Sequence, residues 1–177
     1  IFNGGVLAAN PITGGLITAR NVTNGGSGTL AVKDLDVTGD VLNGGMMFIS
    51  NILEASRHIE STQSSTLTAG RIYVGGNFLY YSANPLVLTT TFQIGGNLHN
   101  QGRIQGTSMG QVANYAGGFV AQTFSGPGVL KFNGAGTGTN VTLANDKTFE
   151  AASFYVGGPL NLGTNSMAVT DNTAFGG

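Results

Sequence analysis

The sequence predicts an all-β protein whose chain winds into a β-solenoid, and three observations lead to this fold class. A short motif recurs in which apolar and polar residues alternate, a glycine pair follows, and a new apolar position begins. The motif returns at a spacing close to 20 residues. Glycine is also frequent, with 30 residues in a chain of 177, whereas only 4 are proline. Repeats of this length bury their apolar face by stacking on one another, which defines a solenoid.

The recurring motif occupies residues 71–78, 91–98 and 153–160. The distance is 20 residues from Gly75 to Gly95 and 40 residues, or two repeats, from Gly117 to Gly157. We expect asparagines at the corners of the coils to stack in ladders from one coil to the next. We also expect the inward-facing strand residues to form a narrow buried core that includes Val74, Ile94, Leu98, Ile104 and Val156.

The alternative fold is an antiparallel β-sandwich or jelly roll. Short strands separated by glycine-rich turns every ~8–12 residues also fit such a fold. The order of the strands in space decides between the two, because a solenoid stacks parallel strands and a sandwich pairs antiparallel ones.

The first 45 residues carry the same signals in a less regular order. Residues 30–37 alternate with period two, which predicts a strand with Leu35 and Val37 buried and with Asp34 and Asp36 pointing outward. Three pairs are predicted turns because asparagine and glycine tolerate positive φ, and these are Asn3-Gly4, Asn24-Gly25 and Asn43-Gly44.

Residues 46–61 interrupt the repeat and predict a short helical or loop insertion in a single β-rich domain of residues 1–177. The distance from Gly44 to Gly75 is 31 residues, about eleven more than one repeat. Four apolar residues fall at offsets 0, 4, 7 and 11, as on one face of a helix, and these are Phe48, Ile52, Ala55 and Ile59. We expect this helix to act as a cap or a docking element.

Strands resume at Leu67 and continue to the end of the chain. The predicted strands of the last third are residues 129–132, 141–143, 149–156 and 167–169, and residues 134–138 are a predicted flexible loop.

The composition excludes several classes of protein. Charged residues make up 8% of the chain, and the net charge is −1, which argues against a nucleic-acid partner because such proteins cluster Lys and Arg. The chain has no cysteine and therefore no disulfide or thiolate metal site. No run of about 18 apolar residues predicts a transmembrane helix. The sequence begins at Ile1 without Met or a signal peptide, so we expect a processed product or a piece of a longer protein.

Two segments resemble known repeats. Residues 95–104 follow the rhythm G-G-x-L-x-N-x-G-x-I, and residues 125–132 are similar to the start of autotransporter-associated strand repeats. Over residues 70–162 the chain resembles the β-helical stalks of bacterial surface proteins, namely filamentous-haemagglutinin-like proteins and autotransporter passengers. The resemblance implies a right-handed β-helix, a structural or adhesive role and a place at the cell surface. It brings no catalytic residues.

A calcium site is one candidate, formed by Asp34, Asp36 and Asp40. Oxygen ligands two positions apart, with Gly39 at the sixth position, are typical of the start of a calcium loop. Gly45 stands at the twelfth position, where such loops have a glutamate. A solvated strand face explains the same residues. We assign no metal, cofactor or catalytic residue from the sequence.

A polysaccharide-degrading enzyme would need paired carboxylates. Five carboxylates show no grouping along the chain, and these are Glu54, Glu60, Asp146, Glu150 and Asp171. Tyr80, Tyr81 and Tyr115 are of the type that stacks on sugars, although such residues more often serve packing. His99, with no second histidine nearby, is expected on the surface of a coil.

The favoured function is that of a non-catalytic extracellular structural or adhesive protein, a surface stalk or a self-assembling filament subunit. The alternatives are a glycan-binding module and a polysaccharide-degrading β-helix enzyme. The expected partners are further copies of the chain or a longer chain of similar repeats, added by strand pairing at open sheet edges. Residues 1–9 are a candidate for such a donated strand. Glycans or a host surface are further candidate partners.

Overall fold

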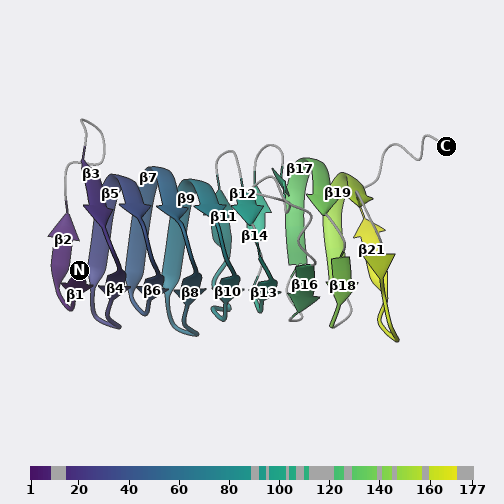
Figure 1. The fold of residues 1–177 in the computed structure, drawn as a ribbon, viewed down its shortest axis with the longest axis horizontal. Helices are drawn as coiled ribbons and strands as arrows, with labels where there is room; N and C mark the ends of the chain where they lie inside the picture. Colours follow the sequence, from purple (N-terminus) through teal and green to yellow (C-terminus); the bar gives the residue numbers. More distant parts are fainter. Residues whose placement is uncertain are drawn as a thin grey trace.

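The computed structural model is a β-solenoid of stacked coils (Figure 1). It describes residues 1–8, 15–88, 92–94, 96–102, 104–106, 110–111, 122–125, 129–138, 141–144, 147–156 and 160–170. Within these residues every regular element is a β-strand. All strand pairs among them are parallel. The predicted solenoid is therefore confirmed, and the alternative antiparallel sandwich is wrong.

The described strands form two sheets. The first sheet has nine short strands in the order β1 (Phe2–Asn3), β4 (Val22–Asn24), β6 (Val41–Asn43), β8 (Ile59–Ser61), β10 (Phe78–Tyr80), β13 (Leu98–Asn100), β16 (Gln122–Ser125), β18 (Val141–Leu143) and β20 (Leu160–Asn161). The second sheet has twelve strands, β2 (Val6–Ala8), β3 (Leu16–Ala19), β5 (Thr29–Val37), β7 (Met46–Ala55), β9 (Thr66–Val74), β11 (Leu86–Leu88), β12 (Phe92–Ile94), β14 (Ile104–Gly106), β15 (Gly110–Gln111), β17 (Val129–Gly138), β19 (Lys147–Val156) and β21 (Met167–Thr170).

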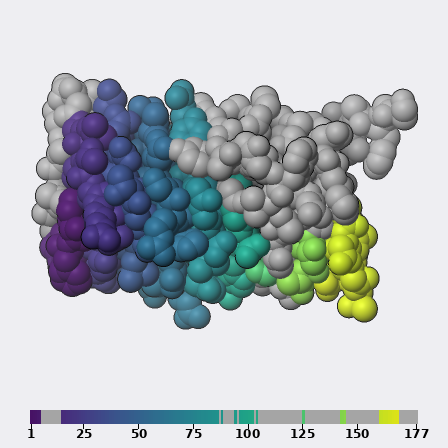
Figure 2. Space-filling model, viewed as in Figure 1, coloured from purple at the N-terminus to yellow at the C-terminus, as the bar shows by residue number. Residues whose placement is uncertain are grey.

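Each coil consists of one short strand, a first corner, one long strand and a second corner. In one coil these parts are β6, the corner at Gly44-Gly45, β7, and the corner at residues 56–58, after which β8 begins the next coil. Val41 pairs with Ile59, Ile59 with Phe78, and Phe78 with Leu98, so these coils contain 18, 19 and 20 residues. The described coils lie side by side along the long axis and meet without a gap between their bands of colour (Figure 2).

The predicted helix at residues 46–61 is wrong, because this segment forms β7 and β8. In β7 the buried residues are Met47, Ile49, Leu53 and Ala55, which is a period of two on either side of an irregular step. The pairing with β9 shifts register between Ile49 and Ile52, as at a β-bulge. The shift moves the apolar phase along the strand and produces a spacing that imitates a helical stripe. Phe48, expected to face inward, is 39% exposed, whereas Ile59 is buried as predicted.

No residues are inserted between Gly44 and Gly75, since the two glycine pairs lie at different corners. Gly44 follows the short strand β6, whereas Gly75 follows the long strand β9. The 31 residues between them therefore span more than one coil, and both coils have ordinary length. The tail strands at residues 129–132, 141–143, 149–156 and 167–169 are confirmed within β17, β18, β19 and β21. Residues 134–138 are not a loop but part of β17, which pairs with β19.

The interior of the coils is a continuous apolar core. Val74, Ile94, Leu98 and Ile104 are fully buried, as predicted, and Leu35 and Val37 are buried on β5. The side chain of Val156 lies outside the described residues. Asp34 and Asp36 face outward and are partly exposed, which confirms the register predicted for residues 30–37.

A ladder of polar side chains runs through the interior at the end of the short strands. Asn3 Nδ2 donates to Asn24 Oδ1 at 2.9 Å, Asn24 Nδ2 donates to Asn43 Oδ1 at 2.9 Å, and Asn43 Nδ2 donates to Ser61 Oγ at 3.3 Å. Each amide also donates to a main-chain carbonyl at the following corner, for example Asn24 Nδ2 to the Met46 carbonyl at 2.9 Å. The predicted asparagine ladder is confirmed, and its polar groups are buried but hydrogen-bonded.

A second ladder runs along the corner that follows each long strand. Each of its side chains accepts a hydrogen bond from the main-chain N–H of the equivalent residue in the next coil. The pairs are Asn21 Oδ1 with Asp40 N at 3.0 Å, Asp40 Oδ1 with His58 N at 3.2 Å, His58 Nδ1 with Asn77 N at 2.8 Å, and Asn77 Oδ1 with Asn97 N at 2.9 Å. Because His58 Nδ1 is an acceptor, the neutral ring carries its proton on Nε2.

Replacing His58 tests this corner ladder. His58→Ala removes the acceptor of the Asn77 N–H and should lower the free energy of unfolding by about 1 kcal/mol, the usual worth of one hydrogen bond. His58→Asn restores an amide oxygen of the kind present at Asn21 and Asn77 and should recover at least half of the loss. Urea denaturation at neutral pH measures both values. Equal stability of the two variants would contradict the assigned role of His58.

The corner glycines are needed for close stacking and not for positive φ. Gly163, with φ of 59°, is the only positive-φ glycine among the described residues, so the positive φ expected at the Asn-Gly pairs is wrong. At Gly45 an added Cβ would collide with the carbonyl oxygens of Gly25 and Gly28 on the preceding coil. Gly26, in contrast, has room for a Cβ, with its nearest neighbour at 3.8 Å. A side chain is thus excluded where one corner rests on another.

Candidate functional site

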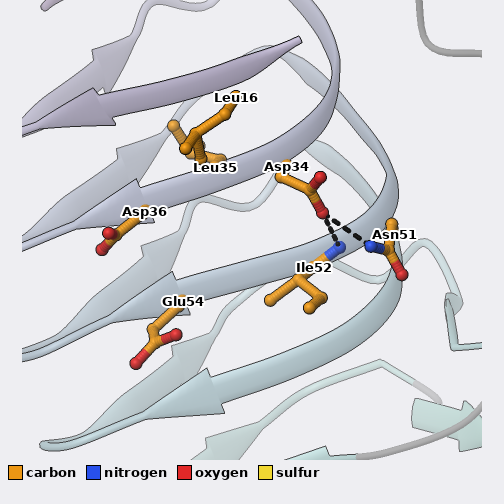
Figure 3. A pocket seen from close by; sticks show the side chains of 7 residues that line it. All are labelled: Leu16, Asp34, Leu35, Asp36, Asn51, Ile52 and Glu54. Atoms are coloured by element: carbon orange, nitrogen blue, oxygen red, sulfur yellow. Dashed lines mark hydrogen bonds between the residues drawn. The ribbon is translucent and has the colours of Figure 1, made fainter. Parts of the chain in front are cut away.

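An acidic groove lies on the outer face of the twelve-stranded sheet, where β3, β5 and β7 run side by side (Figure 3). It encloses about 290 Å³. Strand pairing places Leu16 beside Asp34, Asp34 beside Ile52, and Asp36 beside Glu54. The lining residues are Leu16, Asp34, Leu35, Asp36, Asn51, Ile52 and Glu54.

Asp34 stabilises the irregular step in β7. Its Oδ1 accepts hydrogen bonds from Asn51 Nδ2 at 2.7 Å and from Ile52 N at 3.2 Å (Figure 3). These donors lie where the register between β5 and β7 shifts, between Asp34 and the preceding Val32. A bulge breaks the regular ladder, and the carboxylate replaces the partner that the Ile52 N–H would otherwise lose. The role of Asp34 is therefore structural.

Asp36 and Glu54 form a carboxylate pair on neighbouring strands. Their Cα atoms are direct partners in the pairing of β5 with β7, and both side chains lie on the same outer face (Figure 3). Burial raises the pKa of the Glu54 carboxyl above its ordinary value of 4.5, and the negative charge of Asp36 raises it further. The sequence showed no grouping of carboxylates, and this pair was missed.

The raised pKa of Glu54 predicts a pH-dependent effect on stability. The folded protein holds the Glu54 proton more tightly than the unfolded chain, so the ionised carboxylate lowers stability at neutral pH. This cost disappears as the pH falls through the raised pKa and below 4.5. Glu54→Gln should therefore raise the urea midpoint at pH 7 but not at pH 3. In an Asp36→Asn background the gain should shrink without vanishing, because burial is the larger cause.

The three aspartates proposed as calcium ligands do not converge. Asp34 and Asp36 lie on β5, whereas Asp40 lies at the next corner, where Arg57 Nη1 approaches its Oδ2 at 3.6 Å. Both Asp40 and Arg57 are largely exposed, so this ion pair contributes little stability. Among the residues that the structure describes, no group of three or more His, Asp or Glu side chains is arranged to hold a metal ion.

A second groove, the tyrosine–histidine groove, lies on the outer face of the nine-stranded sheet and encloses about 310 Å³. It is lined by Asn77, Leu79, Tyr81, Asn97, Leu98, His99 and Ser125. Leu79 and His99 are partners in the pairing of β10 with β13, and His99 is in turn the partner of Ser125. Coil stacking thus brings together residues from three successive coils.

The aromatic wall of this groove is formed by Tyr81 and His99. Their ring centroids are 4.8 Å apart and the planes meet at 42°. His99 Nδ1 and Ser125 Oγ are 2.9 Å apart, at hydrogen-bonding distance. His99 is therefore on the surface of a coil, as predicted, but in a defined setting.

The other residues considered from the sequence fall in different places. Tyr80 is fully buried and donates its hydroxyl hydrogen to the Asn84 carbonyl at 2.7 Å, and burial raises its pKa. Glu60 lies beside Leu79 on the nine-stranded sheet, and the backbone of Glu150 pairs with that of Lys131. Tyr115, Asp146 and Asp171 lie outside the described residues.

Comparisons with known proteins leave the fold without a family. No protein-family model, curated protein sequence or solved structure matches this chain. None of the described residues forms a helix with the length and apolarity that a membrane crossing requires.

Proposed function

We propose that this chain is a non-catalytic extracellular scaffold, a stalk or filament module of the kind found in bacterial surface proteins. The observation that carries the proposal is the unbroken stacking of parallel coils, with a core and two hydrogen-bonded ladders that run from coil to coil. Such a stack transmits structure along one axis and resists bending, which suits a stalk. The low proportion of charged residues, 8%, favours association with similar coils.

The first described coil supports the addition of a further coil. β1 pairs with β4 on one side, and its Phe2 is 80% exposed. Along the interior ladder each Oδ1 accepts from the amide of the coil before it, and at Asn3 that oxygen accepts the Gly5 N–H at 3.2 Å. A coil placed against β1, from a second copy or from a longer chain, would extend both the sheet and the ladder. The proposed partner is therefore another coil of the same kind.

Assembly of the purified chain tests this function. Multi-angle light scattering and negative-stain electron microscopy at tens of micromolar should show a mass that grows with concentration and rods of uniform width. Phe2→Lys places a charge at the β1 edge and should shift the chain toward monomers. Phe48→Lys is the matched control, because Phe48 is also exposed but lies on the outer face of a central strand. A chain that stays monomeric at these concentrations would contradict self-assembly.

A second candidate function, polysaccharide cleavage, is favoured by the Asp36–Glu54 pair. A carboxyl of raised pKa can protonate the glycosidic oxygen, while the neighbouring carboxylate activates a water or attacks the sugar carbon. Release of reducing ends from a panel of soluble polysaccharides measures this activity. Both Asp36→Asn and Glu54→Gln should abolish it, whereas Asp40→Asn, outside the groove, should not. The scaffold proposal predicts no release at all.

A further inference from the structure

The tyrosine–histidine groove interrupts an otherwise repetitive surface. At the outward position of the short strands, strand pairing aligns Thr23, Leu42, Glu60, Leu79 and His99 in successive coils. His99 is the only aromatic ring in this series, and it packs at 4.8 Å against Tyr81 of the preceding coil. Coil stacking does not require this pair, because the coils from Val22 to Tyr80 stack without it.

The aromatic wall is available to a ligand. Tyr80 points into the core, so Tyr81, the next residue along an extended chain, points outward. Tyr81 and His99 are both partly exposed and line the same cavity. The face of an aromatic ring carries partial negative charge and attracts the C–H groups on the apolar face of a sugar ring.

The rim of the groove supplies neutral hydrogen-bonding groups. Asn77 Oδ1 accepts the Asn97 N–H at 2.9 Å, which fixes the orientation of the amide and leaves its two N–H hydrogens outside the corner ladder. The Asn97 side chain is exposed. Ser125 adds a hydroxyl beside His99. The groove thus combines amide and hydroxyl groups with an aromatic wall.

The lining contains no Asp, Glu, Lys or Arg. A phosphate, sulfate or carboxylate ligand would find no opposite charge there, whereas a neutral ligand rich in hydroxyl groups would match both the rim and the wall. The volume of about 310 Å³ lies at the lower end of the range for ligand pockets, ~300–1,000 Å³, which suits the end of a chain or one short segment.

We propose that the tyrosine–histidine groove is a binding site for a neutral saccharide, with Tyr81 as the stacking platform and Asn77 and Asn97 as the hydrogen-bonding rim. The proposal goes beyond the scaffold function, because a rod has no need of a ligand site and this site does not depend on assembly. It adds a specific adhesive contact on the side of the solenoid.

A glycan array tests the ligand class. The complete 177-residue chain is applied to an array that carries neutral hexose and N-acetylhexosamine oligosaccharides together with sialylated and sulfated ones. We expect binding to neutral oligosaccharides. The strongest neutral oligosaccharide is then titrated against the protein by calorimetry at millimolar concentration. Binding confined to acidic glycans, or no binding to any neutral saccharide, would overturn the proposal.

Variants locate the site. Tyr81→Ala should weaken binding by roughly tenfold, since a ring contact of up to ~1.5 kcal/mol is lost, whereas Tyr81→Phe keeps the ring and should stay within about threefold. Asn97→Ala retains the N–H that bonds Asn77 and should weaken binding by about threefold or more. Tyr73→Ala, on the other sheet, is the control and should bind normally. Thermal midpoints show that each variant is folded. Unchanged affinity in both Tyr81→Ala and Asn97→Ala would place any binding elsewhere and overturn the assignment.

Discussion

Met47→Ala should lower the free energy of unfolding by about 2–5 kcal/mol, whereas Met46→Ala should change it by less than about 0.5 kcal/mol. The two methionines are adjacent on β7, but Met47 is 0% exposed and Met46 is 47% exposed. Truncation of Met47 removes buried methylene groups and leaves a cavity between coils, because neighbouring coils cannot collapse into it without breaking their strand pairing. Guanidinium denaturation followed by circular dichroism measures both changes.

This pair of variants also separates a strand from a helix. Two adjacent residues on a strand point to opposite faces, whereas adjacent residues on a helix differ by only ~100° and share part of their surroundings. Similar losses for Met46→Ala and Met47→Ala would contradict the register of β7. A change in the slope of unfolding with denaturant would signal a change in the unfolded state and would call for the comparison at a second temperature.

The general fold was accessible from the sequence because its signals are local. Period-two alternation at residues 30–37 and around Gly75 and Gly95 predicted strands with one buried face, and the structure has these faces inward. The interior ladder was predictable in kind, since asparagine ends several short strands just before a glycine corner. Each of these features depends on residues close together in the chain.

The segment 46–61 shows why local patterns fail at a bulge. One irregular step between Ile49 and Ile52 changed which residues face inward, and nothing in the residue types marks that step. The glycine pairs added a second error, because Gly44 and Gly75 mark different corners of the coil. A spacing measured between different corners says nothing about the length of a coil.

The grooves depend on the exact length of each coil. Asp36 and Glu54 are 18 residues apart, and so are Tyr81 and His99, and the groups meet only because the coils around them place them in register or at adjoining corners. A repeat of 20, taken from the glycine pairs, brings neither pair together. A search for residues 18 or 19 apart would have found both, and this spacing is the signal that was present but unused.

The interior ladder also bears on the proposed function. A stalk must keep one register over many coils, and an apolar core alone tolerates slippage, since one aliphatic residue replaces another at small cost. An amide that donates to the next coil and accepts from the previous one has a single satisfied register, because a displaced amide would be buried without partners. Asn24 occupies the centre of such a chain of bonds, between Asn3 and Asn43.

Asn24→Ala should therefore lower the free energy of unfolding by about 2–4 kcal/mol, because the Oδ1 of Asn43 loses its donor and the Nδ2 of Asn3 loses one acceptor, each in a buried site. Asn24→Asp should be more damaging at pH 7. It keeps the shape of the side chain but replaces a donor by a charged oxygen that faces Asn43 Oδ1 and the carbonyls of Gly28 and Met46.

The pH dependence of Asn24→Asp gives the sharpest check. Burial would raise the pKa of the new carboxyl, so the folded state gains a proton before the unfolded chain does, and the loss of stability should diminish as the pH falls. Asn24→Ser is the control, since Ser61 already occupies the equivalent ladder position and accepts from Asn43. Urea midpoints should fall in the order wild type, Ser, Ala, Asp at pH 7, with the Asp variant recovering toward the Ala variant at pH 4. If Ala were as stable as Ser, or Asp showed no recovery in acid, the interior ladder would not set the register of the coils.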